Sequence, residues 1–452
     1  MTTVAITSTA HTLPADAELN GLVEQVLEEA KSKGATSAEA SVSVGVGLSV
    51  SVRQGEVDTL EHQRDRFLGV TVYFGQRQGS ASSADFSADS LRATVAAACS
   101  IARYTSEDPA QGLADPSLLA TRFPDLELFH PWELNADQAI ELAKASEAAA
   151  LATDARIINT DGANVSTHAG LRAYGNSNGF LGTTRRTRHG TSCMVIARDE
   201  QGMHRDYWYT VNRAPGKLES AESVGRQAAQ RTVRRLGSRR LGTRRTPVLY
   251  APTVAQGLLG HLVGAIHGGS LYRRASFMLD HLGKQVFPEH VTLTEHPYLK
   301  GAMGSSAFDN EGVQTRERVL VDRGVLQGYV LDSYSARKLG MQTTGNAGGV
   351  SNLTMTPGAL DFEGLLREMG TGLVVTELMG QGVNLVTGDY SRGASGFWVE
   401  NGEIAYPVQE ITVAGNLRDM YMGLMAAGTD LDRRGNLVTG SLLIDGMTVA
   451  GE

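Results

Sequence analysis

The sequence predicts an α+β protein, with an N-terminal α/β layered domain and a C-terminal domain rich in β-strands. Up to residue 245, segments with helical spacing of apolar residues flank segments in which apolar and polar residues alternate. From residue 246, short strand patterns and hairpin turns dominate. The length of 452 residues suggests two or three domains, and 41% hydrophobic with 20% charged residues is typical of a soluble globular protein. We therefore expect domains over 1–245 and 246–452.

Residues 16–104 predict a unit of helix, strands and helix. Apolar residues recur at helical spacing in the outer segments and alternate with polar residues in the inner ones, as half-buried strands require. Gly34 provides a stop for the first helix, and a turn is expected near Gly55. The predicted elements are helices over 16–33 and 87–104 and strands over 38–53 and 67–74.

The same pattern returns after a connector. Residues 105–135 hold four of the twelve prolines and little periodicity. Residues 136–236 then predict helix, strands and helix again, so we expect an internal repeat of an α/β layered unit. Different strand orders in the two units would contradict this repeat. The predicted elements are helices over 136–153 and 220–236 and strands over 155–166, 170–176 and 191–197.

Hairpins and helices make up the predicted C-terminal domain. Asn401-Gly402 stands between two short apolar runs, and this dipeptide suits a type I′ turn, which needs positive φ at both central residues. A second hairpin is expected over 317–331. The other predicted elements are a strand over 247–251 and helices over 253–266 and 361–369. We expect a curved sheet or an open barrel covered by helices.

Composition restricts the classes of partner and the location. A net charge of -8 argues against a general nucleic-acid binder and favours protein or peptide partners. Cys99 and Cys193 form no CxxC pair, which predicts reduced thiols and a cytoplasmic protein. No apolar run reaches the roughly 20 residues of a membrane span. Residues 1–19 lack the basic and apolar regions of a secretory signal.

Two segments are rich in arginine. Residues 226–245 contain eight arginines, and RRTRH at 185–189 contains three. Arginine forks fit phosphate, so one interpretation is contact with phosphate or nucleic acid. Because the whole chain is acidic, we favour for both segments a solvated helix end and linker whose arginines pair with carboxylates at a domain or subunit boundary.

The histidines near the predicted helix 253–266 do not form a metal-binding pattern. His261 and His267 are six residues apart, about 120° around a helix axis, whereas the histidines of HExxH differ by about 40°. We expect both to serve packing or hydrogen bonding. Residues 281–296 combine three histidines with two glutamates at spacings that match no ligand pattern. Asp309 and Glu311 are either paired carboxylates or part of a turn.

Several runs in the second half of the chain carry a resemblance. They are FDNEGV (308–313), DSYSARKLG (332–340), ELMGQG, TGDYSRGASGFWVENGEIAYPV and EITVAGNL. Together they resemble the TldD/PmbA family of bacterial peptidases, also called modulators of gyrase, and within it the PmbA branch, also named TldE. The resemblance covers at least residues 250–450.

The resemblance implies a degenerate metal site. Catalytic members of the TldD branch carry H-E-x-x-x-H on the corresponding helix and take another ligand from a cysteine near the C-terminus. With Val263-Gly264 kept in register, Gly260 and Ala265 stand at the histidine positions and His261 at the glutamate position. Near the C-terminus the sequence offers Thr439 and no cysteine.

The resemblance therefore implies a noncatalytic or weakly catalytic subunit of a heteromeric metallopeptidase that cleaves unfolded peptides and matures peptide antibiotics. We expect no metal on this chain, zinc or a similar divalent metal in a TldD-like catalytic subunit, and a dimer of the two. Glycine-rich strand edges suit an extended peptide that adds a strand. Candidates for the cleft or interface are His261, His267, Asp389 and Arg392, the last two as a salt bridge or as substrate contacts.

Two alternatives remain open. In the first, the chain is a self-sufficient homodimeric metallopeptidase whose metal ligands are not among the positions named above. In the second, the chain is a regulatory binding module that acts on gyrase or nucleic acid, and segment 226–245 is the only support for it in the sequence.

Overall fold

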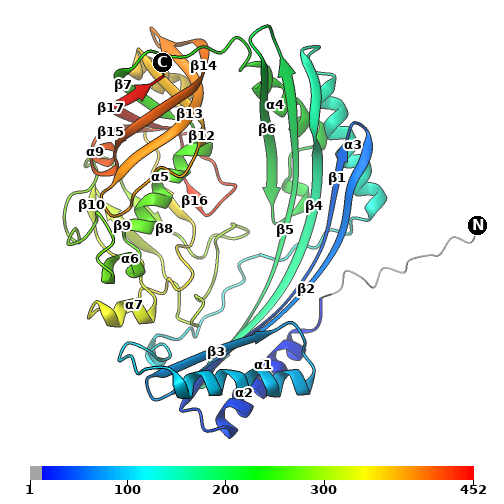
Figure 1. Ribbon diagram of the computed structural model, residues 1–452, viewed down its shortest axis with the longest axis vertical. Coiled ribbons are helices and arrows are strands. Elements are labelled where there is room, and N and C mark those ends of the chain that lie inside the picture. Colours follow the sequence, from blue (N-terminus) through cyan, green and yellow to red (C-terminus); the bar gives the residue numbers. More distant parts are fainter. Residues whose placement is uncertain (1–12, 452) are drawn as a thin grey trace, which may run out of the picture.

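The computed structural model describes residues 13–451, so most of the N-terminal stretch without a signal pattern, residues 1–12, lies outside the described residues. A long curved sheet with helices lies beside a C-terminal part that contains a small barrel (Figure 1). Between residues 13 and 451, no helix combines the length and apolar character needed to cross a membrane.

The N-terminal sheet has the strand order β3-β2-β1-β4-β5-β6, and neighbouring strands are antiparallel. Each half runs helix, three strands, helix, and the first strands of the halves, β1 and β4, pair at the centre. The strand order is thus the same in both halves, as the predicted repeat requires. The elements are α1 (Asp16–Ser32), β1 (Ser37–Arg53), β2 (Glu56–Phe74), β3 (Arg77–Ser83), α2 (Ala88–Tyr104), α3 (Ala136–Leu151), β4 (Ile157–Asn176), β5 (Leu181–Arg198), β6 (Met203–Asn212) and α4 (Ala221–Val233).

The two faces of this sheet differ in chemistry. Alternate residues of β1, such as Val42 and Val50, are fully buried in apolar clusters with the helices α1 to α4. Burying such a side chain contributes roughly 1.5–3 kcal/mol, so the helix-covered face carries the apolar core of this part. The residues between them, such as Ser43 and Gly45, point to the opposite face, which we call the open face and which looks toward the C-terminal part (Figure 1).

The strands are longer than the sequence predicted, and β3 and β6 were not predicted. β4 runs without a break where two strands, 155–166 and 170–176, were expected, and β5 begins at Leu181 rather than Thr191. On the open face these stretches carry polar or small residues. The sequence therefore loses its alternation of apolar and polar residues, although the strands continue to pair. The first twelve residues of β2 are exposed at every position, so neither face of this stretch shows apolar alternation.

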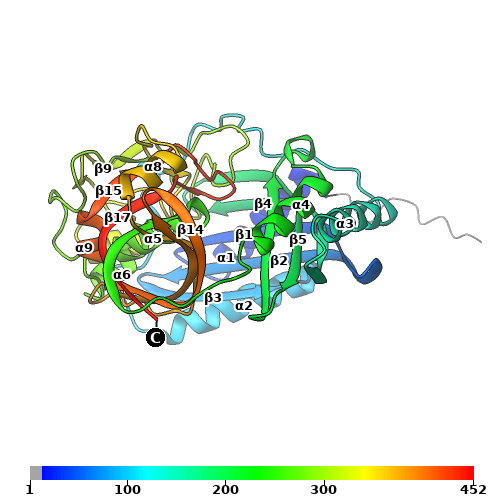
Figure 2. The ribbon, with the colours of Figure 1, turned by 90° about the horizontal axis from the view of Figure 1, so that it is seen from above.

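The C-terminal part holds a six-stranded sheet of order β14-β13-β12-β7-β17-β15 and a smaller sheet of order β10-β9-β8-β11-β16. Pairing of β14 with β17 closes five of these strands into a barrel, which appears as a ring from above (Figure 2). The elements are β7 (Arg244–Tyr250), α5 (Pro252–Ala265), α6 (Gly268–Tyr272), β8 (Leu293–Glu295), β9 (Arg318–Asp322), β10 (Val325–Leu326), α7 (Ser333–Lys338), β11 (Leu353–Met355), α8 (Phe362–Met369), β12 (Gly372–Met379), β13 (Asp389–Glu400), β14 (Glu403–Asn416), α9 (Leu417–Met422), β15 (Leu424–Ala427), β16 (Leu437–Val438) and β17 (Leu442–Ala450).

The α+β class and the curved C-terminal sheet are confirmed, and the barrel is closed rather than open. Asn401 and Gly402 have φ values of 54° and 79° and join β13 to β14, as the hairpin pattern predicted. α5 packs against β12 and β16 and buries Leu258 and Leu262 in the C-terminal core.

Glu147 of α3 holds the tip of the β1–β2 hairpin, where Gln54 and Gly55 both have positive φ. Its buried carboxylate accepts hydrogen bonds from the backbone N–H groups of Gln54 (2.8 Å) and Gly55 (2.7 Å). We predict that Glu147→Ala lowers the free energy of unfolding by about 2 kcal/mol, because two amides lose their acceptor. Hydrogen exchange at these two amides should accelerate. Glu141→Ala, on the exposed side of α3, is the matched control, and an equal effect of both changes would contradict the prediction.

Candidate functional site

The positions that the resemblance equates with metal ligands lie on α5 and just after β16. A Cβ built on Gly260 would approach Leu437 to 3.6 Å, so this face of α5 lies beside the segment that leads to Thr439. Ala265 is fully buried. Thr439 is also fully buried, and its hydroxyl donates a hydrogen bond to the carbonyl of Gly440 (3.1 Å). Glycine, alanine and an engaged threonine leave no strong metal donor at these three positions.

His261 and His267 have separate roles. The ring of His261 packs edge-on against Tyr390 with 6.1 Å between centroids. Burial lowers the pKa of His261, and the charge of Arg392 lowers it further, so the neutral imidazole is favoured at pH 7. His267 caps the N-terminus of α6, where its Nδ1 accepts a hydrogen bond from the N–H of Gly269 (3.1 Å).

The side chains present do not fit a bound metal ion. In the part of the chain that the structure describes, no three His, Cys, Asp or Glu side chains gather as a metal site would require. Three of the five histidines and glutamates of 281–296 have partners elsewhere, and His296 is one of them, with its Nδ1 3.5 Å from Glu317. The Nδ1 of His281 lies 2.7 Å from the carbonyl of Leu279, and buried Glu295 accepts from Arg318 (2.8 Å) and Asn346 (2.8 Å).

Asp389 and Arg392 do not form the salt bridge that the sequence allowed. They are three residues apart on β13, so their side chains point to opposite faces of the strand. Asp389 accepts hydrogen bonds from the side chains of Thr387 (2.6 Å) and Asn416 (3.3 Å). Arg392 donates to the carbonyl of Met379 (3.4 Å) and lines a cavity of about 310 Å³ between β6 and β12.

Asp309 and Glu311 form part of a buried turn. The Asp309 carboxylate accepts hydrogen bonds from the N–H groups of Glu311 (2.9 Å), Val313 (3.0 Å) and Ala347 (2.9 Å). Burial raises the pKa of Asp309 to about 6. Burial, with the charge of Asp309, raises the pKa of Glu311 to about 7. The turn interpretation accounts for the hydrogen bonds, and Asp309, with its raised pKa, also lines a large cavity.

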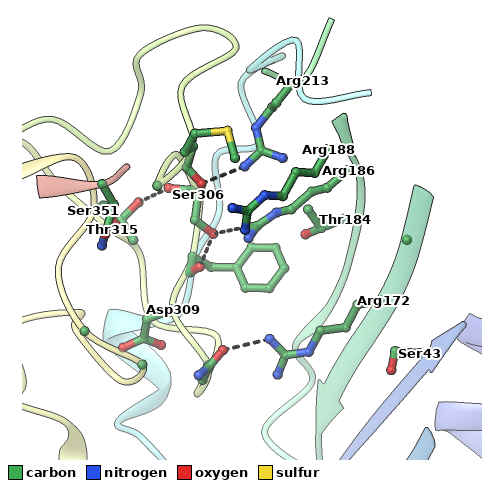
Figure 3. A pocket seen from close by; sticks show the side chains of 18 of the residues that line it. Ser43, Arg172, Thr184, Arg186, Arg188, Arg213, Ser306, Asp309, Thr315 and Ser351 are labelled. Atoms are coloured by element: carbon green, nitrogen blue, oxygen red, sulfur yellow. Dashed lines mark hydrogen bonds between the residues drawn. The ribbon is translucent and has the colours of Figure 1, made fainter. Parts of the chain in front are cut away.

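This cavity, of about 710 Å³, lies between the open face of the sheet and loops of the C-terminal part (Figure 3). Its floor is formed by β1, β4 and β5, and its roof by residues 303–310, 345–351 and 434–436. The roof segment 434–436 continues directly into Leu437, the residue that lies beside Gly260 of α5.

The strand register arranges the floor in rows across β1, β4 and β5. The first row is Ser43, Arg172 and Thr184, and the second is Gly45, Gly170 and Arg186. Residues of β1 therefore meet residues of β4 and β5 that lie far from them in sequence. The two glycines carry no side chains, and the ring of His168 occupies part of the space above them, since a Cβ on Gly45 would lie 2.9 Å from its Nε2.

Arginines dominate the charge of this cavity. Arg172 donates to the side chain of Asn310 (2.7 Å), and Arg186 to the hydroxyl of Ser306 (3.2 Å), so the floor contacts the roof directly (Figure 3). Arg213 is buried and donates to the carbonyls of Ala302 (3.0 Å) and Met303 (2.7 Å). Burial and the nearby arginines lower the pKa of Arg213 to about 10.

The prediction for RRTRH at 185–189 is correct for Arg185, which pairs with Asp16 (2.6 Å), and wrong for Arg186. Arg186 and Arg188 are two apart in β5, so both side chains face the cavity. Arginines at alternate positions of a strand are the signal that could have revealed this face.

The prediction for 226–245 is confirmed for the arginines that form ion pairs. Arg231 (3.3 Å) and Arg235 (3.4 Å) pair with Asp206, and Arg240 pairs with Glu410. Others stack on aromatic rings of the barrel strands: Arg234 on Phe397, Arg239 on Tyr406 and Arg244 on Trp398.

Known proteins resemble this chain over nearly its whole length. Models described as PmbA/TldA metallopeptidase domain 1, central domain and C-terminal domain match residues 38–102, 129–236 and 243–451. Metalloprotease PmbA of Escherichia coli O157:H7 is 52% identical over 96% of both chains, and Metalloprotease PmbA homolog of Haemophilus influenzae is 48% identical over 98% of both.

Solved structures show the same architecture. A proposed modulator of DNA gyrase from Bacteroides thetaiotaomicron superposes with a TM-score of 0.91 at 31% identity, covering 96% of this chain and 99% of its own. TldE from Thermococcus kodakarensis superposes with a TM-score of 0.84 at 19% identity, covering 95% of this chain and 100% of its own, and shares the fold.

The raised pKa of Glu311 predicts a pH dependence of stability. Its carboxyl has an unperturbed value of 4.5 and a folded value of about 7, so the folded state binds more protons between them, and the free energy of unfolding falls as pH rises through this range. Glu311→Gln keeps an acceptor oxygen for the N–H of Ser333 and should reduce this fall by about 2 kcal/mol. Denaturant unfolding from pH 4.5 to 7.5 measures how the free energy of unfolding changes with pH, and Glu363→Gln at an exposed position is the control. An unchanged slope in Glu311→Gln would refute the assignment.

Proposed function

The chain belongs to the TldD/PmbA family of metallopeptidases, and on this premise we propose that it is a noncatalytic companion subunit of a TldD/TldE-type peptidase. The observation that carries this proposal is the chemistry of the mapped ligand positions. Gly260 and Ala265 have no donor atoms, and the hydroxyl of Thr439 is buried and engaged. A catalytic zinc ion takes about three protein ligands, and the remaining mapped residue, His261, supplies one imidazole.

The proposed partner is a TldD-like chain that supplies zinc or a similar divalent metal. The structural likeness to a protein named TldE supports this pairing. In the proposed complex, the present chain contributes a surface that holds unfolded peptide near the partner's metal.

The edge of β12 is the proposed peptide-holding element. β7 pairs with Leu373 to Val375, and among the described strands none pairs with residues 376–379 on that side. Thr376, Glu377 and Leu378 line the cavity of about 310 Å³ together with β6 and Arg392. An extended peptide can bind such an edge through hydrogen bonds of its backbone alone. Because this binding does not depend on the peptide's side chains, it suits unfolded substrates of varied sequence.

The relatives' names favour a second candidate. Both curated relatives above are named metalloproteases, which supports a self-sufficient homodimeric peptidase with ligands outside the mapped positions. A role on gyrase or nucleic acid has less support, because arginines of 226–245 are already paired with carboxylates or stacked on aromatic rings.

The two candidates predict different results in a cleavage assay. As a companion subunit, the purified chain with added zinc should leave an unstructured peptide intact, and its mixture with a TldD-like chain from the same organism should cleave it. A chelator should abolish cleavage by the mixture. Cleavage by this chain alone that is lost with a chelator and with His261→Ala would refute the companion role and support the homodimer.

A further inference from the structure

We propose that the cavity on the open face is an oxyanion-binding site, in which Arg172, Arg186 and Arg188 bind a carboxylate or phosphate group. This inference needs neither a metal nor a partner chain, so it stands apart from the proposed function. Three features of the cavity support it: its unbalanced positive charge, its unused donors and its shape.

No ion pair among the described residues neutralises the positive charge of the floor. Burial lowers the pKa of Arg172, and the charges of Asp309 and Glu39 offset part of this effect. Among the described residues, no carboxylate forms an ion pair with Arg172, Arg186, Arg188 or Arg213. Like charges in a partly enclosed space repel one another, and a bound anion removes that cost. Arg434, which also lines the cavity, differs because Asp432 holds it through two hydrogen bonds (2.9 and 2.7 Å).

The carboxylates that line the cavity do not balance these arginines. Asp309 is directed to the backbone amides of its own turn and of Ala347. Asp65 is exposed on β2 opposite Gly45 and forms no ion pair with a described residue. The floor therefore presents guanidinium groups whose charge is available to a ligand.

Donors of these arginines remain unused. The Nε–H of Arg186 is buried and has no hydrogen-bond partner among the described residues. The side chain of Arg188 forms no hydrogen bond or ion pair with a described residue, although it faces the cavity. Each planar guanidinium fork can donate two parallel hydrogen bonds to two oxygens of a carboxylate or phosphate, and the two forks are two residues apart on one strand.

The shape of the floor fits a small anionic group. Gly45 and Gly170 lie side by side next to Arg186 and carry no side chains. His168 reaches over this area, since a Cβ on Gly45 would lie 2.9 Å from its Nε2. Ser43 and Thr184 add hydroxyl donors in the neighbouring row (Figure 3). A cavity of about 710 Å³ suits a small molecule or the end of a peptide rather than a duplex nucleic acid.

Isothermal titration calorimetry of the full chain at low salt tests the site with three probes. These are inorganic phosphate, an unstructured peptide with a free C-terminal carboxylate, and the same peptide with an amidated C-terminus. We expect phosphate or the free-carboxylate peptide to bind, and the amidated peptide to bind at least about tenfold more weakly than its acid form if the ligand is a peptide terminus. Phosphate binding without peptide binding would assign the site to a phosphate.

Arg188→Gln is the principal variant, because Arg188 is exposed and its loss removes no described hydrogen bond, so folding is retained. Compared with the unchanged chain, Arg188→Gln should bind the probe at least about tenfold more weakly, and so should Arg186→Gln. Arg92→Gln on α2 removes the same charge from the helix-covered side and should leave binding unchanged. The proposal is overturned if neither phosphate nor the free-carboxylate peptide binds at millimolar concentration, or if Arg188→Gln and Arg92→Gln bind equally well.

Discussion

Arginine side chains that cross between the N-terminal sheet and the C-terminal loops fix the walls of the large cavity. Arg213 reaches from the end of β6 to the carbonyls of Ala302 and Met303, and Arg434 returns to the carbonyl of Tyr209 (3.0 Å). Each hydrogen bond from a charged donor contributes about 1.5–3 kcal/mol. The larger apolar cores lie beneath the helices and around the barrel. A smaller apolar cluster crosses the boundary, because Phe308 of the C-terminal loops packs on Phe180 with 5.1 Å between ring centroids and is buried with Tyr174. Polar and apolar contacts together therefore set the distance between floor and roof.

The same residue type serves two purposes in this chain. Arginines of 226–245 are neutralised by carboxylates or cover aromatic rings, as Arg235 does with Asp206 and Glu377 and Arg244 does with Trp398. They attach the connecting segment to both parts of the molecule. The cavity arginines Arg186 and Arg188 lack such partners among the described residues. This difference in pairing separates structural arginines from those available to a ligand.

Local patterns were sufficient for most helices and for the hairpins, because capping, periodicity and turn chemistry act within a few residues. The helix predicted over 361–369 forms as α8, and Asn401-Gly402 forms the turn between β13 and β14. β6 escaped prediction because buried polar residues, His204 and Asp206, take the places of apolar ones in its alternation. The cavity could not be predicted, because its rows depend on the pairing of β1 with β4, in which partner residues are more than a hundred positions apart, and on the pairing of β4 with β5. The degenerate ligand positions were identified through the family resemblance, and the structure shows which residues surround them.

Zinc binding by this chain tests the companion role most directly. The purified chain is dialysed against a small excess of zinc and then against metal-free buffer, and its zinc content is measured by inductively coupled plasma mass spectrometry. A noncatalytic subunit predicts zinc far below one ion per chain, with the same content in His261→Ala. One retained zinc ion per chain that is lost in His261→Ala would contradict the account, because it would place a working metal site on the helix where Gly260 and Ala265 offer no ligand.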